Sequence, residues 1–187
     1  ALLDLCISDD APDMVKVREL IDGGINLRYQ DDDGVTSLIA AVFGHCHTDV
    51  VMALLEADDS VEHIRMTDVC GSTSLMMASM HGETGIVKAL LGADPSEEHV
   101  RMVDKDGNTS LLHASSHGFN DIAKLLLEAD PSVEHVRMVD KDGHTCLFFA
   151  SSSGCNDIVK LLLEADPSVE HVRMKDSDGK IAFDYAE

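Results

Sequence analysis

Aromatic and basic residues are scarce in this chain, and both shortages limit what it can be. Trp is absent, aromatic residues make up 4% of the 187 positions, and hydrophobic residues make up 44%. The core is therefore aliphatic, which suits thin stacked helices better than one large central core. Lys and Arg number 14 against 35 Asp and Glu, a formal net charge of −21. Because nucleic-acid binding needs clustered Lys and Arg to neutralise phosphates, the composition argues against a nucleic-acid partner.

Paired cysteines and long apolar runs are also missing. The five cysteines are odd in number and form no Cys-x-x-Cys pair, so neither a disulfide framework nor a zinc ribbon is indicated. The chain shows no signal peptide, no targeting run and no apolar stretch long enough to cross a membrane. These absences argue against membrane insertion and favour an intracellular, cytoplasmic location.

Internal repetition dominates the rest of the chain. The fifteen residues 124–138 recur unchanged at 160–174, an offset of 36 residues. A unit repeated at such a period cannot bury its apolar face alone and stacks on its neighbours as a solenoid. The glycines that follow an Asp-rich triplet or its remnant keep nearly the same offset, at spacings of 37, 36, 36 and 36: Gly34, Gly71, Gly107, Gly143 and Gly179.

One unit, residues 104–139, contains the elements expected in every repeat. Asp-Lys-Asp-Gly-Asn-Thr at its start is a turn signal and predicts a projecting hairpin. A short first helix is expected from Thr109, as N-cap or first residue, to the stop at Gly118. A second helix begins at Asn120, and its apolar positions fall on one face: Ile122, Leu125, Leu126 and Ala129.

The loop after the second helix is lengthened in the later repeats. Asp followed by Pro, as in Asp130 and Pro131, is a helix-start signal with Asp as N-cap and Pro at the first helical position. We therefore predict an extra helical turn in each long loop. Within these turns, Glu and Arg at i and i+3 predict weak ion pairs: Glu62 with Arg65, Glu98 with Arg101, Glu134 with Arg137, and Glu170 with Arg173.

The pattern Asp-x-x-Gly-x-Thr-x-Leu, then Ala, Gly and Val/Ile-x-x-Leu-Leu, resembles the ankyrin repeat along the whole chain. It is carried by Thr36-Ser37-Leu38, Thr73-Ser74-Leu75, Thr109-Ser110-Leu111 and Thr145-Cys146-Leu147, each followed by Ala. Two features depart from the family's usual Thr-Pro-Leu-His-x-Ala. Ser or Cys replaces Pro, and an apolar residue replaces His: Ile39, Met76, Leu112 and Phe148. The unit of about 36 residues is also longer than the usual period near 33.

The resemblance implies an all-α ankyrin-repeat solenoid of stacked helix-turn-helix units with projecting hairpin turns. One domain is expected over 1–187. Its predicted parts are a partial repeat at 1–30, full repeats at 31–67, 68–103, 104–139 and 140–175, and a partial repeat at 176–187.

Residues that could bind a metal are present but poorly placed. Stacked repeats lie roughly 10 Å apart, whereas zinc holds its ligands at about 2.0–2.3 Å. The repeated histidines His63, His99, His135 and His171 therefore cannot share one ion. The tripeptide His45-Cys46-His47 is denser, and whether it binds a metal is left open. The Asp-x-Asp-Gly turns lack the later ligands of a calcium loop. No P-loop, nucleophile elbow or zinc-protease motif occurs, so neither a catalytic residue nor a cofactor is predicted.

The resemblance also implies a binding surface. Ankyrin proteins usually contact partners in a concave groove, through hairpin tips and the exposed side of first helices. By position, the tips here are Asp32, Asp33 and Val35; Val69, Cys70 and Ser72; Lys105, Asp106 and Asn108; Lys141, Asp142 and His144. The helix positions are Phe43, Met80, His81, Ser116, His117, Ser152 and Ser153. Four apolar neighbours are assigned mainly to the core between repeats: Met76, Met77, Phe148 and Phe149.

Two functional hypotheses follow. The first is a non-enzymatic scaffold whose acidic tips, with Phe43 and Met80 as an apolar end, favour a protein or peptide with a basic surface and an apolar anchor. The alternative is a regulatory or targeting segment of a larger enzyme or channel. It arises because the chain starts at Ala1 rather than Met and stops inside a repeat at Glu187, as expected of an excised piece. The last helix, predicted from Ile181 to Glu187, leaves a flank uncovered and so allows self-association.

Overall fold

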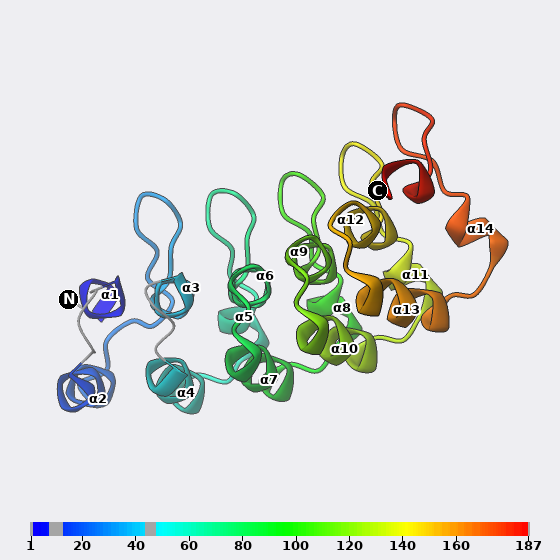
Figure 1. The fold of residues 1–187 in the computed structure, drawn as a ribbon. Coiled ribbons are helices and arrows are strands. Elements are labelled where there is room, and N and C mark those ends of the chain that lie inside the picture. Colours follow the sequence, from blue (N-terminus) through cyan, green and yellow to red (C-terminus); the bar gives the residue numbers. More distant parts are fainter. Residues whose placement is uncertain (1, 8–12, 44–47, 187) are drawn as a thin grey trace. The chain divides into compact units, whose positions relative to one another are not determined.

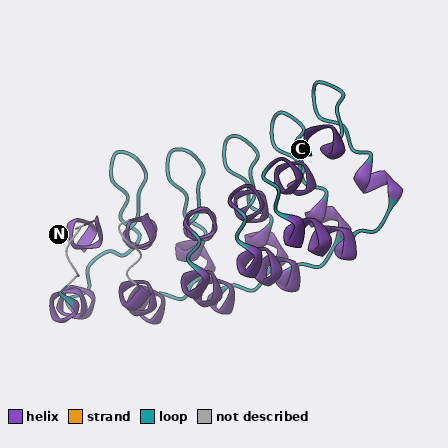
Figure 2. Ribbon diagram, in the orientation of Figure 1, coloured by secondary structure: helices purple, strands orange, loops and turns teal. Residues whose placement is uncertain are grey.

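The protein is built from helices joined by loops, as the computed structural model shows for residues 2–7, 13–43 and 48–186 (Figures 1 and 2). No extended strand occurs in these ranges; two isolated antiparallel bridges join Val139 to Thr145 and Lys175 to Ile181. The predicted all-α class is confirmed. The chain divides into two compact units, Ala1–Pro95 and Ser96–Glu187.

The first unit stacks three helix pairs. Helix α3 packs against α1 on one side and α6 on the other, and α4 packs likewise against α2 and α7. The loops that precede α3 and α6 project from the same side of this unit (Figure 1). Its elements are α1 (Leu2–Ile7), α2 (Met14–Asp22), α3 (Ser37–Phe43), α4 (Thr48–Ala57), α5 (Val61–Ile64), α6 (Ser74–His81) and α7 (Thr84–Ala93).

The second unit continues the pattern. Helix α9 packs on α12, which packs on η1, while α10 packs on α13. The predicted last helix is a short 3₁₀ helix, η1, over Ala182–Tyr185. The remaining elements of this unit are α8 (Glu97–Val100), α9 (Ser110–His117), α10 (Asn120–Ala129), α11 (Val133–Val136), α12 (Cys146–Ser152), α13 (Asn156–Ala165) and α14 (Val169–Val172).

Each projecting loop is a tight turn organised by one aspartate. In the first, Asp31 Oδ1 accepts the backbone N–H groups of Asp33 at 3.0 Å and Val35 at 2.8 Å. Gly34 has a φ of 74°, and a side chain there would meet the backbone N of Val69 at 3.0 Å. The turn therefore needs glycine at this position for both its conformation and its close neighbour. The same aspartate contacts recur at Asp68, Asp104, Asp140 and Asp176.

The first helices are capped as the sequence predicts. Thr109 is the N-cap of α9, and its side chain accepts the N–H of Leu112 at 3.2 Å. At the other end, Gly118 has a φ of 75° and donates its N–H to the Ala114 carbonyl. A left-handed C-cap of this kind ends a helix without the steric cost that a side chain would add.

The predicted extra turns are present, but their caps differ from the prediction. Helix α11 begins at Val133, because the Ser132 side chain accepts the N–H of His135 at 3.2 Å. The assignment of Asp130 as N-cap and Pro131 as first helical residue is therefore wrong. Asp130 instead ends the preceding helix α10. Ser60, Ser96 and Ser168 cap the other extra turns in the same way.

An aspartate that follows each of α4, α7, α10 and α13 joins consecutive repeats within each unit; Asp94, Asp130 and Asp166 are buried, and Asp58 is half-buried. Asp94 Oδ2 accepts a hydrogen bond from Arg65 Nε at 2.6 Å, and Asp58 accepts one from Arg28 at 2.9 Å. In the second unit, Asp130 binds Arg101 and Asp166 binds Arg137. We call this repeated contact the arginine–aspartate clasp.

For Arg137, the clasp replaces the ion pair that was predicted inside the extra turn. Arg137 pairs with Asp166 and Glu170 of the next repeat, so the predicted pair with Glu134 is wrong. The physical reason is that Asp166 is only 2% exposed. A buried carboxylate needs a donor more than the solvated Glu134 does.

The repeated histidines are core residues. His135 is fully buried, and its Nδ1 donates to the Asp130 carbonyl oxygen at 3.0 Å. His63 and His171 make the same contact with Asp58 and Asp166. Burial lowers the pKa of His135, which favours the neutral ring. Each of these three rings is thus held by a carbonyl of its own repeat.

The clasp predicts that removing a clasp arginine lowers the free energy of unfolding more than removing an exposed lysine. Arg137→Gln should lower the free energy of unfolding by about 2 kcal/mol, because the buried Asp166 loses its charged partner. Lys124→Gln on α10 removes an exposed ion pair with Glu128 and should cost at most about 0.5 kcal/mol. Urea unfolding followed by circular dichroism measures both. Equal effects would contradict the clasp.

The clasp also predicts acid sensitivity. Burial opposes ionisation of Asp130, but the hydrogen bonds from Arg101 and Ser132 outweigh it and lower its pKa to about 2. The unfolded chain, with a carboxyl pKa of about 3.9, binds more protons than the folded chain at acid pH. This contribution to stability is present above the unfolded pKa and is lost as pH falls from about 4 towards 2. Urea unfolding at pH 6, 4 and 3 should show that decline, and Asp130→Asn should flatten it. The exposed Asp121→Asn serves as control and should leave the decline unchanged.

Candidate partner-binding surface

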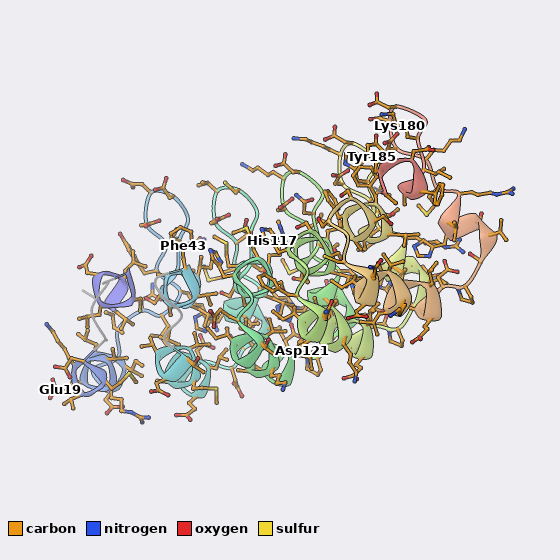
Figure 3. All side chains as sticks on the ribbon, viewed as in Figure 1. Glu19, Phe43, His117, Asp121, Lys180 and Tyr185 are labelled. Atoms are coloured by element: carbon orange, nitrogen blue, oxygen red, sulfur yellow. The ribbon has the colours of Figure 1, made fainter. Side chains whose placement is uncertain are left out.

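The residues predicted to contact a partner lie at the surface of their own unit. In the first unit, Val35, Ser72 and Met80 are half-buried, and the others are exposed: Asp32, Asp33, Phe43, Val69, Cys70 and His81. In the second unit, Asn108, Ser116 and His144 are half-buried, and the others are exposed: Lys105, Asp106, His117, Lys141, Asp142, Ser152 and Ser153. Figure 3 labels Phe43 and His117 on the first helices α3 and α9.

Backbone hydrogen bonds fix the spacing between neighbouring tips. Val69 N–H donates to the Asp33 carbonyl at 2.8 Å in the first unit. In the second unit, Lys141 N–H donates to Asp106 at 2.8 Å and Ser177 N–H to Asp142 at 2.9 Å. Side chains on adjacent tips are therefore held at fixed separations rather than moving independently.

A hollow of about 420 Å³ opens in the first unit between its two projecting turns. Apolar side chains from α3, α6 and both turns form most of its wall, and three aspartates lie among them. The lining residues are Asp31, Asp33, Val35, Ile39, Ala40, Phe43, Asp68, Val69, Cys70 and Met77. We call this feature the first-unit hollow. Five of these residues were predicted to contact a partner, namely Asp33, Val35, Phe43, Val69 and Cys70, and the others were assigned elsewhere or not singled out in the sequence.

Met77 differs from its predicted role. Met77 was assigned to the core between repeats, but it is half-buried and lines the hollow, whereas Met76 is 2% exposed and does lie in the core. Met80 lies outside the lining. Met77 precedes His81 by four residues, so both lie on one face of α6. Because His81 was predicted to face a partner, this spacing was the signal in the sequence that Met77 lies on the same surface.

Phe43 stands at the edge of the hollow. Its side chain is 59% exposed, and its ring lies edge-on to that of His81, with centroids 5.8 Å apart. Phe43 therefore presents apolar surface to solvent while its neighbour limits how it can turn. It joins α3 to α6 at the mouth of the hollow.

The equivalent surface of the second unit is polar and bonded to itself. Lys141 Nζ lies 2.7 Å from Asp106 Oδ1, which bridges two adjacent tips. Asn108 and His113 both bond the side chain of Asp104, the latter at 3.2 Å. These side chains therefore bond to one another across and within the tips.

Aromatic rings support the last described tips of the second unit. His144 stacks on Phe148 with centroids 4.0 Å apart, and Phe148 meets Tyr185 at 4.3 Å. Phe148 and Phe149 are half-buried, so their assignment to the core is only partly right. Lys180 lies over the Tyr185 ring, 4.8 Å from its centroid, and Figure 3 labels both. His144 is thus held in place by the rings beneath it.

Comparison with known proteins decides the family. The model for ankyrin repeats, in three copies, matches residues 3–100, 59–137 and 75–176. The chain belongs to the ankyrin repeat family. A comparison with curated proteins returned no significant match. The fold is thus an all-α ankyrin-repeat solenoid, and ankyrin domains are generally non-enzymatic modules for protein–protein interaction.

Within the described part of this ankyrin domain, three potential metal ligands lie close together in one tip. Ligand atoms of Asp140, Asp142 and His144 lie within 4.8 Å of one another. Asp140 Oδ1, however, already accepts the N–H groups of Asp142 and His144, as in the other tips. The turn itself therefore explains the cluster. The tripeptide His45-Cys46-His47 lies outside the described residues.

A serine and a histidine also meet without forming a catalytic relay. Ser116 Oγ lies 2.9 Å from His117 Nδ1, but that nitrogen lies equally close to the His113 carbonyl. The nearby carboxylate of Asp104 contacts His113 instead. A nucleophile needs a base that an acid orients, and this series is not assembled at Ser116. Among the described residues, no helix is long and apolar enough to cross a membrane.

The exposure of this surface predicts that it can be changed without unfolding the ankyrin domain. Phe43→Ala and Met80→Ala should each change the free energy of unfolding by less than about 1 kcal/mol, since neither side chain is buried. Leu111→Ala in the core, where the side chain is fully buried, should cost about 2–5 kcal/mol. Urea unfolding provides the comparison. A loss at Phe43 as large as that at Leu111 would show that Phe43 is structural.

Proposed function

We propose that this ankyrin domain is a non-enzymatic scaffold that binds a peptide or protein partner in a concave groove formed by its hairpin tips and first helices. The observation that supports this most is the first-unit hollow, which combines an apolar wall with carboxylates on turns of fixed spacing. Apolar contacts supply affinity, while charges around them select the partner.

The charge of the chain supports a basic partner. The net charge is −21, and Asp32 and Asp33 extend into solvent from the first tip. Opposite charge accelerates encounter and disfavours acidic competitors. The partner surface that fits these tips carries Lys or Arg next to apolar side chains.

We further propose a reducing, intracellular setting. The described cysteines are unbridged: Cys6, Cys70, Cys146 and Cys155. Burial raises the pKa of the Cys6 and Cys146 thiols to about 12, so both remain protonated core residues. Unpaired thiols persist most readily in a reducing compartment.

Quantitative affinity capture with matched baits tests the binding surface. The wild-type chain is compared with Phe43→Ala/His117→Ala, which alters the first helices, and with Lys124→Ala/Glu128→Ala, which alters exposed residues of α10. For a protein that binds the proposed groove, the amount captured should fall by about tenfold with the first bait variant. The amount captured by the second bait variant should equal that of the wild type. Partners lost only with the α10 variant would place binding on the second helices and contradict the proposal.

A further inference from the structure

The first-unit hollow occupies positions that are polar in the second unit. Two repeats further along the chain, four apolar lining residues of the hollow have polar counterparts. The pairs are Val35 and Asn108, Ala40 and His113, Phe43 and Ser116, and Val69 and Lys141. The backbone turns are alike in both units, so the hollow arises from these side chains.

The polar residues of the second unit supply partners for its aspartates. Lys141 pairs with Asp106 across two tips at 2.7 Å, and His113 and Asn108 bond Asp104. Asp33 and Asp31 occupy the equivalent positions of the first unit. Asp33 is exposed and forms no ion pair with another described residue, and the position of Lys141 is taken by Val69. Among its described residues, the first unit therefore has the carboxylate without the cation that pairs with it in the second unit.

From this difference we infer that the first-unit hollow binds a segment of a protein partner that carries an apolar side chain and, within three residues, a Lys or Arg. The apolar side chain enters between Val35, Phe43 and Val69. The cation pairs with Asp33, as Lys141 pairs with Asp106. The inference rests on the proposed function and specifies the chemistry of its partner.

The lining favours a peptide over a small polar ligand or an anion. Asp31 and Asp68 each commit Oδ1 to two backbone N–H groups of their own turn. The lining residues include no Lys, Arg or His that could hold a phosphate or carboxylate. A small ligand needs placed polar groups to fix its orientation, whereas a peptide brings its apolar and cationic groups already linked.

Selection of peptides on the whole chain tests this inference. A phage-displayed library of random dodecapeptides is selected on the wild-type protein, and the consensus peptide is measured by fluorescence anisotropy. We expect a consensus with one large apolar residue and a Lys or Arg within three positions. Replacing either residue of the peptide by Ala should weaken binding by about tenfold.

Variants of the protein locate the site. Val69→Lys reproduces the second unit by supplying a cation to Asp33. Ala40→His places a larger side chain in the wall of the hollow. Each variant should weaken binding of the consensus peptide by about tenfold or more. Val103→Lys is the matched control, because Val103 is 46% exposed against 49% for Val69 and belongs to the other unit. It should change the dissociation constant by less than about twofold. Since Val69 is exposed, the fold of its variant should persist, whereas Ala40 is buried. Circular dichroism therefore checks that both variants are folded, and a loss of binding by an unfolded Ala40→His leaves Val69→Lys as the deciding variant.

The outcomes separate this inference from the proposed function. A consensus without the apolar and basic pair, or binding unaffected by both Val69→Lys and Ala40→His, overturns the inference. If the selected peptides instead respond to His117→Ala, binding lies on the second unit, and the scaffold function stands without this site. If neither the peptides nor the captured proteins respond to any tip or first-helix variant, both proposals fail.

Discussion

A buried carboxylate at the ends of α7, α10 and α13 is the constraint around which the repeat is organised. Asp94, Asp130 and Asp166 are 3%, 0% and 2% exposed, so each needs bonded partners to remain ionised. For Asp130, an arginine of the preceding repeat provides the charge, while Ser132 donates its backbone N–H. Ser132 also caps the extra turn, and the Asp130 carbonyl holds His135. Stacking, helix ending and loop conformation therefore depend on the same few atoms.

This arrangement explains why one sequence can serve successive junctions. A stacked repeat presents one face to the repeat before it and another to the repeat after it. The same two complementary faces therefore form every junction. In both the Arg101–Asp130 and the Arg137–Asp166 clasp, the arginine Nε accordingly donates to the aspartate Oδ2, and the guanidinium also donates to the serine two residues after that aspartate. Adjacent tips are also joined by backbone hydrogen bonds, which do not depend on the identity of the side chains. Side-chain variation at the tips is therefore compatible with an unchanged scaffold.

The fold could be read from the sequence because its signals are local and repeated. The Asp turns, Thr109, Gly118 and the apolar periods each act within one repeat, and the structure agrees with them. The clasp could not be read in this way, since Arg137 and its acceptor Asp166 lie 29 residues apart and meet only after stacking. The cap of the extra turn was misassigned because Asp-Pro and Ser offer competing start signals. Ser132 prevails because Asp130 is held by Arg101.

The candidate surface was predictable in its location but not in its contents. Position within the repeat identified Val35, Phe43 and Cys70. A hollow, however, depends on side chains from two repeats and on how little space the side chains between them fill. Small residues such as Ala40 make room without giving a positive signal of their own. In the second unit, the larger His113 and the cation of Lys141 occupy the corresponding positions and bond to aspartates. The same backbone thus yields a polar surface whose side chains bond to one another in one unit, and in the other an apolar recess beside Asp33, which pairs with no described cation. Under the proposed binding function, that contrast, rather than the duplicated segments, supplies the physical basis for specificity.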